Sequence, residues 1–357
     1  MRWPSLTLSA PQRPRLNLAL QGGGAHGAFT WGVLDALLEA DRFAIAAVSG
    51  TSAGAINGVL LAHGLVQGGP AAARAALDTF WSAVGTRIPF EWLTVGADET
   101  LAFNPLARTM LRWSQLFAPH QLNPLDNDPL RDLLQEQVDF AALRSSAAPR
   151  LAIAATHANS GRLRVFGNAA LGIDAVLASA CLPSLHQAVL IDGEPYWDGG
   201  YSANPALLPL LADPRCATDT LLVLLAPREH THTPRQREEI AERAMDIAFQ
   251  APFLRELELL AALQADAGSR WWPGGGLAAR IARARWHLVD GGPLLATLRG
   301  ETRLIAHLPF LQGLRDAGRA AAQQWLQGPA RRVGLRGGTD LRALARGDAG
   351  TVPADGH

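Results

Sequence analysis

The feature that most constrains this chain is the pattern G-x-S-x-G formed by Gly50, Ser52 and Gly54. An apolar strand is predicted over residues 43–48 and a helix over residues 55–65, so the residues between them must form a sharp turn. This arrangement is typical of a nucleophile elbow. The serine backbone in such a turn is strained, so the residues two positions away must be small. We expect the Ser52 hydroxyl to stand clear of the sheet at the positive end of the following helix, where developing negative charge is stabilised.

The composition excludes several classes of protein. The 357 residues are 48% hydrophobic and 18% charged, which is enough to form the core of one large domain or two small ones. The net charge is zero and charges of both signs are interspersed, so no nucleic-acid partner is expected. Two cysteines, Cys181 and Cys216, form neither a disulfide framework nor a metal cluster. No signal peptide is expected in residues 1–15, and no apolar run is long enough to predict a membrane-spanning helix.

A glycine-rich loop separates an apolar strand predicted over residues 16–20 from an amphipathic helix. Together with the elbow, the order is strand, loop, helix, strand, turn and helix, which predicts a parallel α/β sheet. Gly22, Gly24 and Gly27 match the dinucleotide fingerprint G-x-G-x-x-G, which is a weak signal alone. That fingerprint requires a carboxylate at the end of the second strand, and this chain has none there.

The same loop also fits an oxyanion hole. Gly22, Gly23 and Gly24 expose backbone N–H groups beside a helix N-terminus, with no side chains in the way. Adjacent parallel strands end at the same edge of a sheet. We therefore expect Gly23 and Gly24 to lie close to Ser52.

Aspartates that precede glycine at the end of a predicted strand are candidates for a general base. Asp198 precedes Gly199 and Gly200 on a tight turn after a predicted strand. Asp290 also precedes two glycines at the end of a short strand, whereas Asp192 occupies the turn of a predicted hairpin. Spacing alone does not decide between Asp198 and Asp290.

Taken in order, the three motifs resemble those of the patatin-like phospholipase family. They are QGGGAHG at residues 21–27, GTSAG at residues 50–54 and DGG at residues 198–200, and the resemblance covers most of residues 16–326. It implies an α/β fold of the patatin type, a three-layer α/β/α sandwich. The central sheet would be mostly parallel, with helices on both faces.

A further block strengthens the resemblance. The segment ASACLP at residues 178–183, followed by an Asp-Gly hairpin and by residues 204–205 (Asn-Pro), is similar to the block around the family's catalytic aspartate. The resemblance therefore favours Asp198 over Asp290.

The resemblance implies a lipid acyl hydrolase of the phospholipase A or carboxylesterase type. Ser52 would be the nucleophile that forms an acyl-enzyme, and Asp198 would be its general base, with no histidine involved. Backbone N–H groups of Gly23 and Gly24 would hold the oxyanion. The expected substrate is an acyl lipid or phospholipid, and no metal or other cofactor is expected.

The chain departs from the family at one position. The family's glycine loop often has arginine where this chain has His26. Arginine is always charged, whereas histidine changes charge near neutral pH, so headgroup dependence would differ if this residue holds a phosphate. The alternative is that His26 only begins the helix.

Two other functions remain open from the sequence. An ordinary Ser-His-Asp hydrolase would need a late histidine, such as His287 or His307, although Ser52 comes unusually early for that fold. A membrane- or granule-associated lipid-binding protein with weak or vestigial esterase activity is the other alternative. Trp271 and Trp272 motivate it, because tryptophans beside arginine are typical of membrane-interface segments.

The predicted organisation is an N-terminal extension over residues 1–15, an acyl-hydrolase domain over residues 16–326 and a tail over residues 327–357. The tail is rich in Gly, Ala, Arg and Asp, so we expect it to be disordered. The expected location is the cytoplasm, with peripheral contact at the inner membrane.

Overall fold

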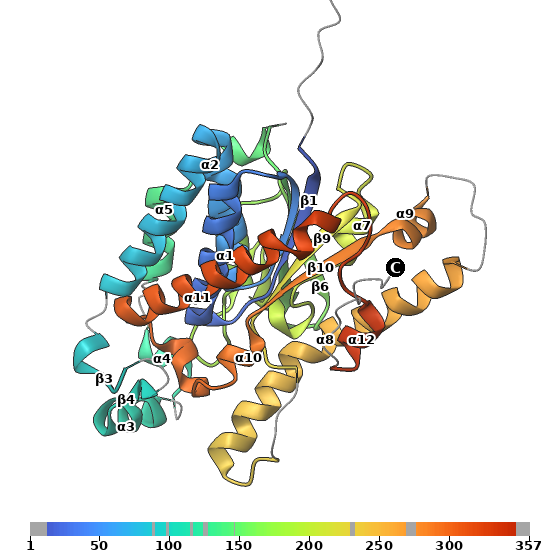
Figure 1. Cartoon of the computed structure of the whole chain (residues 1–357). Coiled ribbons are helices and arrows are strands. Elements are labelled where there is room, and N and C mark those ends of the chain that lie inside the picture. The colour runs from blue at the N-terminus through green and yellow to red at the C-terminus, as the bar shows by residue number, and fades with distance from the viewer. Residues whose placement is uncertain are drawn as a thin grey trace, which may run out of the picture.

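The computed structural model describes residues 13–87, 90–97, 100–114, 117–123, 128–145, 147–228, 233–268 and 276–347. These residues form a three-layer α/β/α sandwich around a mostly parallel sheet (Figure 1), which confirms the predicted fold class. The strands of the main sheet are β1 Arg15–Leu20, β2 Ala44–Gly50, β5 Arg150–His157, β6 Leu163–Gly167, β7 Val189–Ile191, β8 Glu194–Asp198, β9 Asp219–Leu224 and β10 Arg285–Asp290. A separate two-stranded sheet consists of β3 Thr94–Val95 and β4 Ala102–Phe103.

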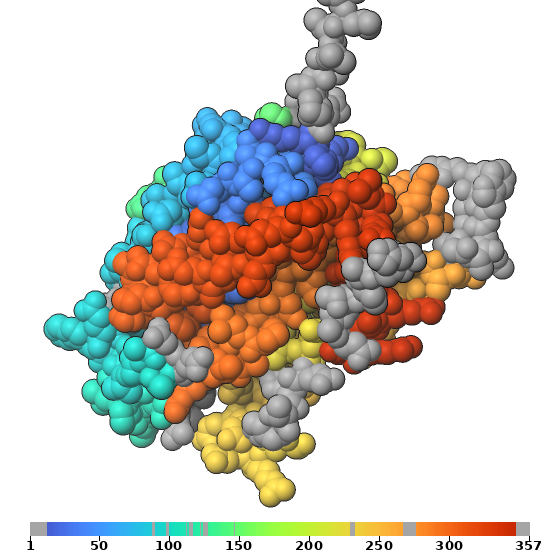
Figure 2. Space-filling model, viewed as in Figure 1, coloured from blue at the N-terminus to red at the C-terminus, as the bar shows by residue number. Residues whose placement is uncertain are grey.

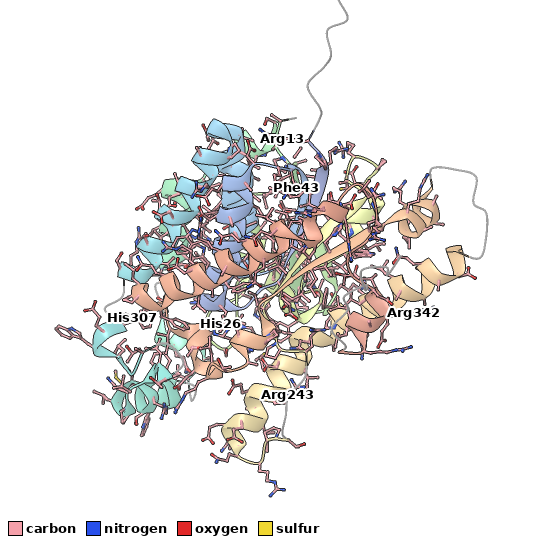
Figure 3. The ribbon with its side chains drawn as sticks, viewed as in Figure 1. Arg13, His26, Phe43, Arg243, His307 and Arg342 are labelled. Carbon is pink, nitrogen blue, oxygen red and sulfur yellow. The ribbon has the colours of Figure 1, made fainter. Side chains whose placement is uncertain are left out.

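The strand order is β10-β9-β1-β2-β5-β8-β7, and β6 also pairs with β5. The five strands from β10 to β5 are parallel, so their carboxyl ends meet at one edge of the sheet. Figure 3 shows this direction, because Arg13 lies just before β1 at one end of the molecule and His26 lies beyond the other end of that strand. Loops that follow these strands therefore gather at the edge marked by His26.

Twelve helices are present in the described residues: α1 Gly27–Ala40, α2 Ala53–Arg87, α3 Pro105–Ser114, α4 Pro119–Leu122, α5 Pro129–Gln137, α6 Ile173–Ser179, α7 Leu208–Ala212, α8 Arg237–Gly268, α9 Leu277–Arg283, α10 Gly292–Leu295, α11 Leu308–Gln327 and α12 Leu341–Ala345. α2 is interrupted at Gly68 and Gly69, where the backbone leaves the helical conformation. Short 3-10 turns include η1 Gly24–His26, η2 Phe90–Trp92, η5 Gly199–Tyr201, η6 Gly300–Leu304 and η7 Pro329–Arg332.

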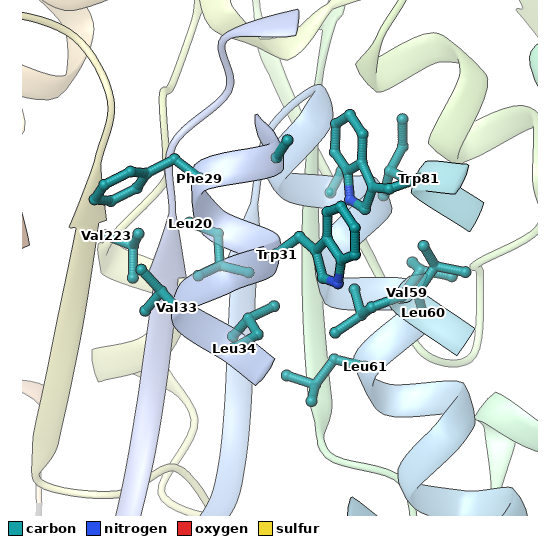
Figure 4. Packing of buried hydrophobic residues seen from close by; sticks show 14 of the residues in the cluster. Leu20, Phe29, Trp31, Val33, Leu34, Val59, Leu60, Leu61, Trp81 and Val223 are labelled. Carbon is teal, nitrogen blue, oxygen red and sulfur yellow. The ribbon is translucent and has the colours of Figure 1, made fainter. Parts of the chain in front are cut away.

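Apolar residues alternate between the two faces of the sheet because successive strand side chains point in opposite directions. Leu18 and Leu20 of β1 belong to the core shared with α1, α2 and α11, whereas Ala19 belongs to the core under α7 and α8. In the first core, Trp31 of α1 stacks on Trp81 of α2 with ring centroids 6.5 Å apart (Figure 4). This packing fixes the second part of α2 against α1.

Two strands approach each other end to end along one edge of β5. β2 runs parallel to β5 and ends with Gly50 opposite Ile153. β8 runs antiparallel to β5 and ends with Asp198 opposite Ala155. The ends of β2 and β8 are thus two residues apart along β5, and the turns that follow them meet at the same place.

The chain after residue 326 differs from the sequence prediction. Residues 327–347 are described and include η7 and α12, so the predicted disorder is wrong over this stretch. Leu341 and Leu344 are buried against α8, and this apolar contact anchors a segment whose average composition is polar. Residues 348–357 lie outside the described residues.

None of the helices in the described part of the chain combines the length and the apolar character needed to cross a bilayer. Trp271 and Trp272, which motivated the lipid-binding alternative, lie outside the described residues.

Candidate active site

Ser52 occupies the turn between β2 and α2 with a positive φ of 54°. Residues other than glycine rarely adopt this conformation, so the surrounding structure must hold it. A side chain at Gly54 would collide with the carbonyl oxygen of Leu20, so the elbow packs directly on the end of β1. The Ser52 N–H donates to Oγ of the buried Ser179 over 2.9 Å. The result is a half-buried serine at the N-terminus of α2.

Asp198 is fixed at the end of β8 by bonds to its backbone. Its N–H donates to the carbonyl oxygen of Cys181 over 2.8 Å, and its own carbonyl oxygen accepts from Oγ1 of Thr156 over 2.8 Å. Its Oδ1 accepts from the N–H of Gly200 over 2.7 Å. The carboxyl group is therefore held in one orientation before any substrate arrives.

The Asp198 carboxyl group is fully buried, and this burial raises its pKa from 3.8 to about 7. The Gly200 N–H and the Ser52 hydroxyl oppose the rise because both stabilise the ionised form. Oδ2 accepts no hydrogen bond from the described residues. A carboxylate with an open oxygen beside a serine hydroxyl, and a pKa near neutrality, is suited to accept the serine proton.

The glycine loop lies at the same edge and divides into two functional parts. The N–H of the buried Gly22 donates to Oδ1 of Asn204 over 2.7 Å. A side chain at Gly22 would approach Cβ of Ser52 to 2.8 Å, so the loop is packed against the elbow. Gly23 and Gly24 are less buried, and within the described residues their N–H groups donate to no partner. These two donors are available to a ligand.

A cavity of about 390 Å³ contains Ser52, Asp198 and the three glycines. Most of its wall is apolar, and this part includes Ile56, Phe80, Trp81, Val84, Leu130 and Phe249. Arg303 and Asp246 form an ion pair on another part of the wall. The arrangement can hold an apolar chain next to a hydroxyl group, a carboxyl group and free N–H donors.

His26 is buried, and its Nε2 lies 2.8 Å from Oγ1 of Thr302. Burial, with a smaller contribution from Arg303, lowers the pKa of His26 to about 3. The ring is therefore neutral throughout the physiological range. The neutral ring connects η1 to η6 and has no positive charge with which to bind a phosphate.

The two competing aspartates lie in other surroundings. Asp290 does not line the cavity; its Oδ1 accepts from Gly292 N–H over 2.9 Å, and its Oδ2 lies 2.9 Å from Arg228. Asp192 is in the β7–β8 turn, where its side chain is 81% exposed. Of the three aspartates, Asp198 alone lies in the cavity with Ser52.

The histidines proposed for a Ser-His-Asp triad are also elsewhere. His287 on β10 is buried, with its Nε2 2.8 Å from Asp219, and does not line the cavity. β10 and β2 are three strand positions apart, or about 14 Å. His307 precedes α11 and is also outside the cavity. His186 does line the cavity, but its exposed ring has no hydrogen-bond or ionic partner among the described residues.

Three residues that support the site were not singled out from the sequence. Ser179 holds the elbow N–H and Asn204 holds the Gly22 N–H, as described above. Oε1 of Gln21 accepts from the N–H groups of Leu225 and Ala226, which joins the glycine loop to the end of β9. All three residues lie in or next to the sequence motifs that resemble the family. Their supporting roles are visible only from their contacts in the folded protein.

Within the described residues, no cluster of His, Cys, Asp and Glu has a composition suited to a metal ion. Cys181 and Cys216 form no disulfide with each other. The Cys216 thiol has its pKa raised to about 11, mainly by burial, so it is not a reactive thiolate at neutral pH.

Comparison with known proteins gives a family assignment. The family model described as patatin-like phospholipase matches residues 18–211, which is more than half of the chain. No curated protein sequence matches the chain significantly.

Solved structures that are similar to the chain include two bacterial proteins. For VipD from Legionella pneumophila, the identity is 15% over 95% of this chain and 78% of that chain, with a TM-score of 0.37. For the ExoU–SpcU complex from the type III secretion system of Pseudomonas aeruginosa, the identity is 18% over 97% of this chain and 73% of that chain, with a TM-score of 0.28. On the family match, this chain belongs to the patatin-like phospholipase family, a family of lipid hydrolases.

Proposed function

We propose that this protein is a lipid acyl hydrolase that uses Ser52 as the nucleophile and Asp198 as the general base. The observation that carries the proposal is the convergence of β2 and β8, which puts a serine with positive φ and a buried carboxyl group in one apolar cavity. The family assignment supports hydrolysis of lipid esters. The carboxylic ester of an acyl lipid or phospholipid is the proposed scissile group.

In the first half of the reaction, the Asp198 carboxylate takes the proton of the Ser52 hydroxyl while Oγ attacks the ester carbonyl carbon. The carbonyl oxygen becomes an oxyanion, which the N–H groups of Gly23 and Gly24 stabilise. The Gly22 N–H is already bonded to Asn204, so its contribution is to hold the loop. The ester C–O bond then breaks, and the leaving alcohol takes the proton from Asp198.

In the second half, Asp198 takes a proton from a water molecule that attacks the acyl-enzyme. A second oxyanion forms in the same hole and collapses with cleavage of the bond to Ser52 Oγ. The proton on Asp198 returns to that oxygen. The free fatty acid leaves, and the dyad is restored without a histidine.

Trp81 is expected to limit the length of the acyl chain. It lines the cavity, is 3% exposed, and its Nε1 donates to Oδ1 of Asn57 over 2.9 Å, which fixes the indole. Trp81→Phe removes part of this wall, so the preferred p-nitrophenyl ester should become longer. Each additional buried methylene is worth about fourfold in kcat/KM. Trp113→Phe makes the same change at an exposed tryptophan that does not line the cavity, so it should keep the wild-type optimum. An unchanged optimum in Trp81→Phe would show that the chain lies elsewhere.

Replacing histidines tests the dyad against a triad. His186→Ala and His287→Gln should each retain kcat/KM for a soluble p-nitrophenyl ester within about threefold, because neither ring is bonded to Ser52 or Asp198. His287→Gln is also expected to unfold at lower denaturant, since it disturbs a buried bond to Asp219. Ester hydrolysis by wild type, measured in parallel, tests the proposed function itself. Removal of a general acid–base catalyst costs about 100-fold or more, so a loss of that size in a folded histidine variant would favour a triad instead.

A further inference from the structure

The segment containing η2, β3, β4 and α3 lies at one end of the molecule (Figure 2). Several of its large apolar side chains are exposed. Trp92 is 82% exposed, Leu106 71%, Trp113 63% and Met110 62%. We call these four residues the apolar lobe surface. Single exposed apolar residues are ordinary, but several large ones within one short segment indicate a contact that the isolated chain leaves uncovered.

α3 is amphipathic with its apolar stripe directed outward. Leu106, Met110 and Trp113 are spaced at i, i+4 and i+7, so they share one face, and all three are exposed. The inward face is narrower and includes Ala107, which is buried, and Leu111, which packs against the main core. An ordinary surface helix turns its apolar stripe toward the core. The orientation of α3 is that of a helix lying on an apolar partner.

The lobe is fixed to the rest of the protein, so the exposure is a property of the folded state. Asn104 Nδ2 donates to the carbonyl oxygen of Trp92 over 2.8 Å, which ties η2 to the start of α3. Arg108 on α3 pairs with Glu301 over 2.9 Å. Glu301 belongs to η6, whose Arg303 and Leu304 line the catalytic cavity. The lobe is therefore attached directly to the cavity wall.

The cavity opens through an apolar rim. Leu185, Met245 and Leu304 line the cavity and are also exposed, at 38%, 38% and 37% respectively. They come from three separate parts of the chain. Leu304 is three residues from Glu301, which anchors α3. The lobe and the rim of the cavity are thus joined through η6.

We propose that the apolar lobe surface docks on a lipid layer and delivers an acyl lipid to the cavity without passage through water. This inference rests on the proposed function, because an acyl-lipid substrate lies in such a layer. Residues 90–114 contain three acidic and two basic residues, so there is no basic excess to attract anionic headgroups. Tryptophan and aliphatic side chains provide the affinity by entering the interface, as in other surface-bound amphipathic helices. The partner is therefore a neutral or zwitterionic lipid surface.

The test compares vesicle binding with hydrolysis of a soluble ester. Binding of the Ser52→Ala protein to phosphatidylcholine vesicles is measured by flotation, so that the lipid stays intact. Adding Met110→Asp and Trp113→Asp should lower the partition coefficient about 100-fold, because two large apolar contacts are lost. Leu335→Asp is the matched control. Leu335 is 78% exposed, on a loop bonded to Trp286 at the amino end of β10, the opposite edge from the cavity.

Activity separates this inference from the proposed function. In the catalytically intact protein, Met110→Asp with Trp113→Asp should reduce hydrolysis of vesicle phospholipid about 100-fold and leave p-nitrophenyl butyrate turnover unchanged. Binding that is lost at about 0.5 M NaCl, at which surface charges are strongly screened, would contradict apolar docking. If the double substitution leaves vesicle binding unchanged, the proposed docking surface is wrong. It is also wrong if the wild type forms a stable dimer in solution that the double substitution dissociates. A wild type that floats but hydrolyses no ester would remove the proposed function and leave the docking surface.

Discussion

Ser52→Ala is expected to abolish ester hydrolysis and leave the protein folded. Without Oγ no acyl-enzyme forms, and loss of a catalytic nucleophile lowers kcat by about 10⁴-fold or more. Alanine fits the elbow because the turn is held through the backbone, including the bond from the N–H of residue 52 to Ser179. The measurement is p-nitrophenyl ester turnover, with circular dichroism and the unfolding midpoint as tests of folding.

Ser160→Ala is a demanding control for this result. Ser160 Oγ lies 2.9 Å from Nδ1 of His157, whose Nε2 lies 2.8 Å from Glu194, so these surface side chains are ordered like a triad. However, the Ser160 and Gly161 N–H groups both donate to the carbonyl oxygen of His157, so they are not available to an oxyanion. We expect Ser160→Ala to keep full activity. Turnover that survives in Ser52→Ala and disappears in Ser160→Ala would move the active site to the surface.

Asp198→Asn is expected to lower kcat/KM by about 10³-fold, because the amide cannot accept the serine proton. Below its pKa of about 7, Asp198 is protonated and cannot act as a base. Wild-type kcat/KM should therefore rise about tenfold per pH unit below pH 7 and level off above it. The residual rate of Asp198→Asn should lack this dependence. A wild-type profile that is flat from pH 5 to pH 9 would exclude Asp198 as the base.

The same substitution has an opposite effect on stability. The folded-state pKa of Asp198 is raised to about 7 from 3.8, so the folded protein binds the extra proton between these values. Stability then falls as pH rises through this window, because ionisation leaves a buried charge. Asn stays neutral at every pH. The difference in free energy of unfolding, Asp198→Asn minus wild type, should therefore be about 2 to 3 kcal/mol larger at pH 8 than at pH 5. Urea unfolding at both pH values measures this, and an unchanged difference would indicate a carboxyl group that is solvated in the folded state.

The sequence predicted those parts of the fold that require particular residue types at neighbouring positions. The elbow needs small residues around Ser52, and the glycine loop needs bare backbone, so both are visible as short patterns. The order and spacing of apolar residues predicted a parallel α/β sheet, and the resemblance to the family added the three-layer sandwich. By contrast, Asp198 and Asp290 have the same local spacing. What separates them is pairing, since β8 is antiparallel to β5 and ends against β2, whereas β10 lies at the far side of the sheet.

Contacts between segments that are distant in the sequence could not be predicted from local sequence patterns. The bond from Gly22 to Asn204 joins residues 182 positions apart. The region after residue 326 was misjudged because its average polarity concealed Leu341 and Leu344, which are enough to anchor α12. The exposed stripe of α3 was also hidden, because periodicity identifies an apolar face without telling which way it points.

The most direct test of the dyad is to react the protein with a fluorophosphonate and locate the adduct by peptide mass spectrometry. One adduct, on Ser52, is expected in wild type. No adduct is expected in Ser52→Ala, and labelling should be at least about 100-fold slower in Asp198→Asn, where the base is missing. An adduct on any other serine, or equally fast labelling of Asp198→Asn, would contradict the assignment of Ser52 and Asp198 as nucleophile and base.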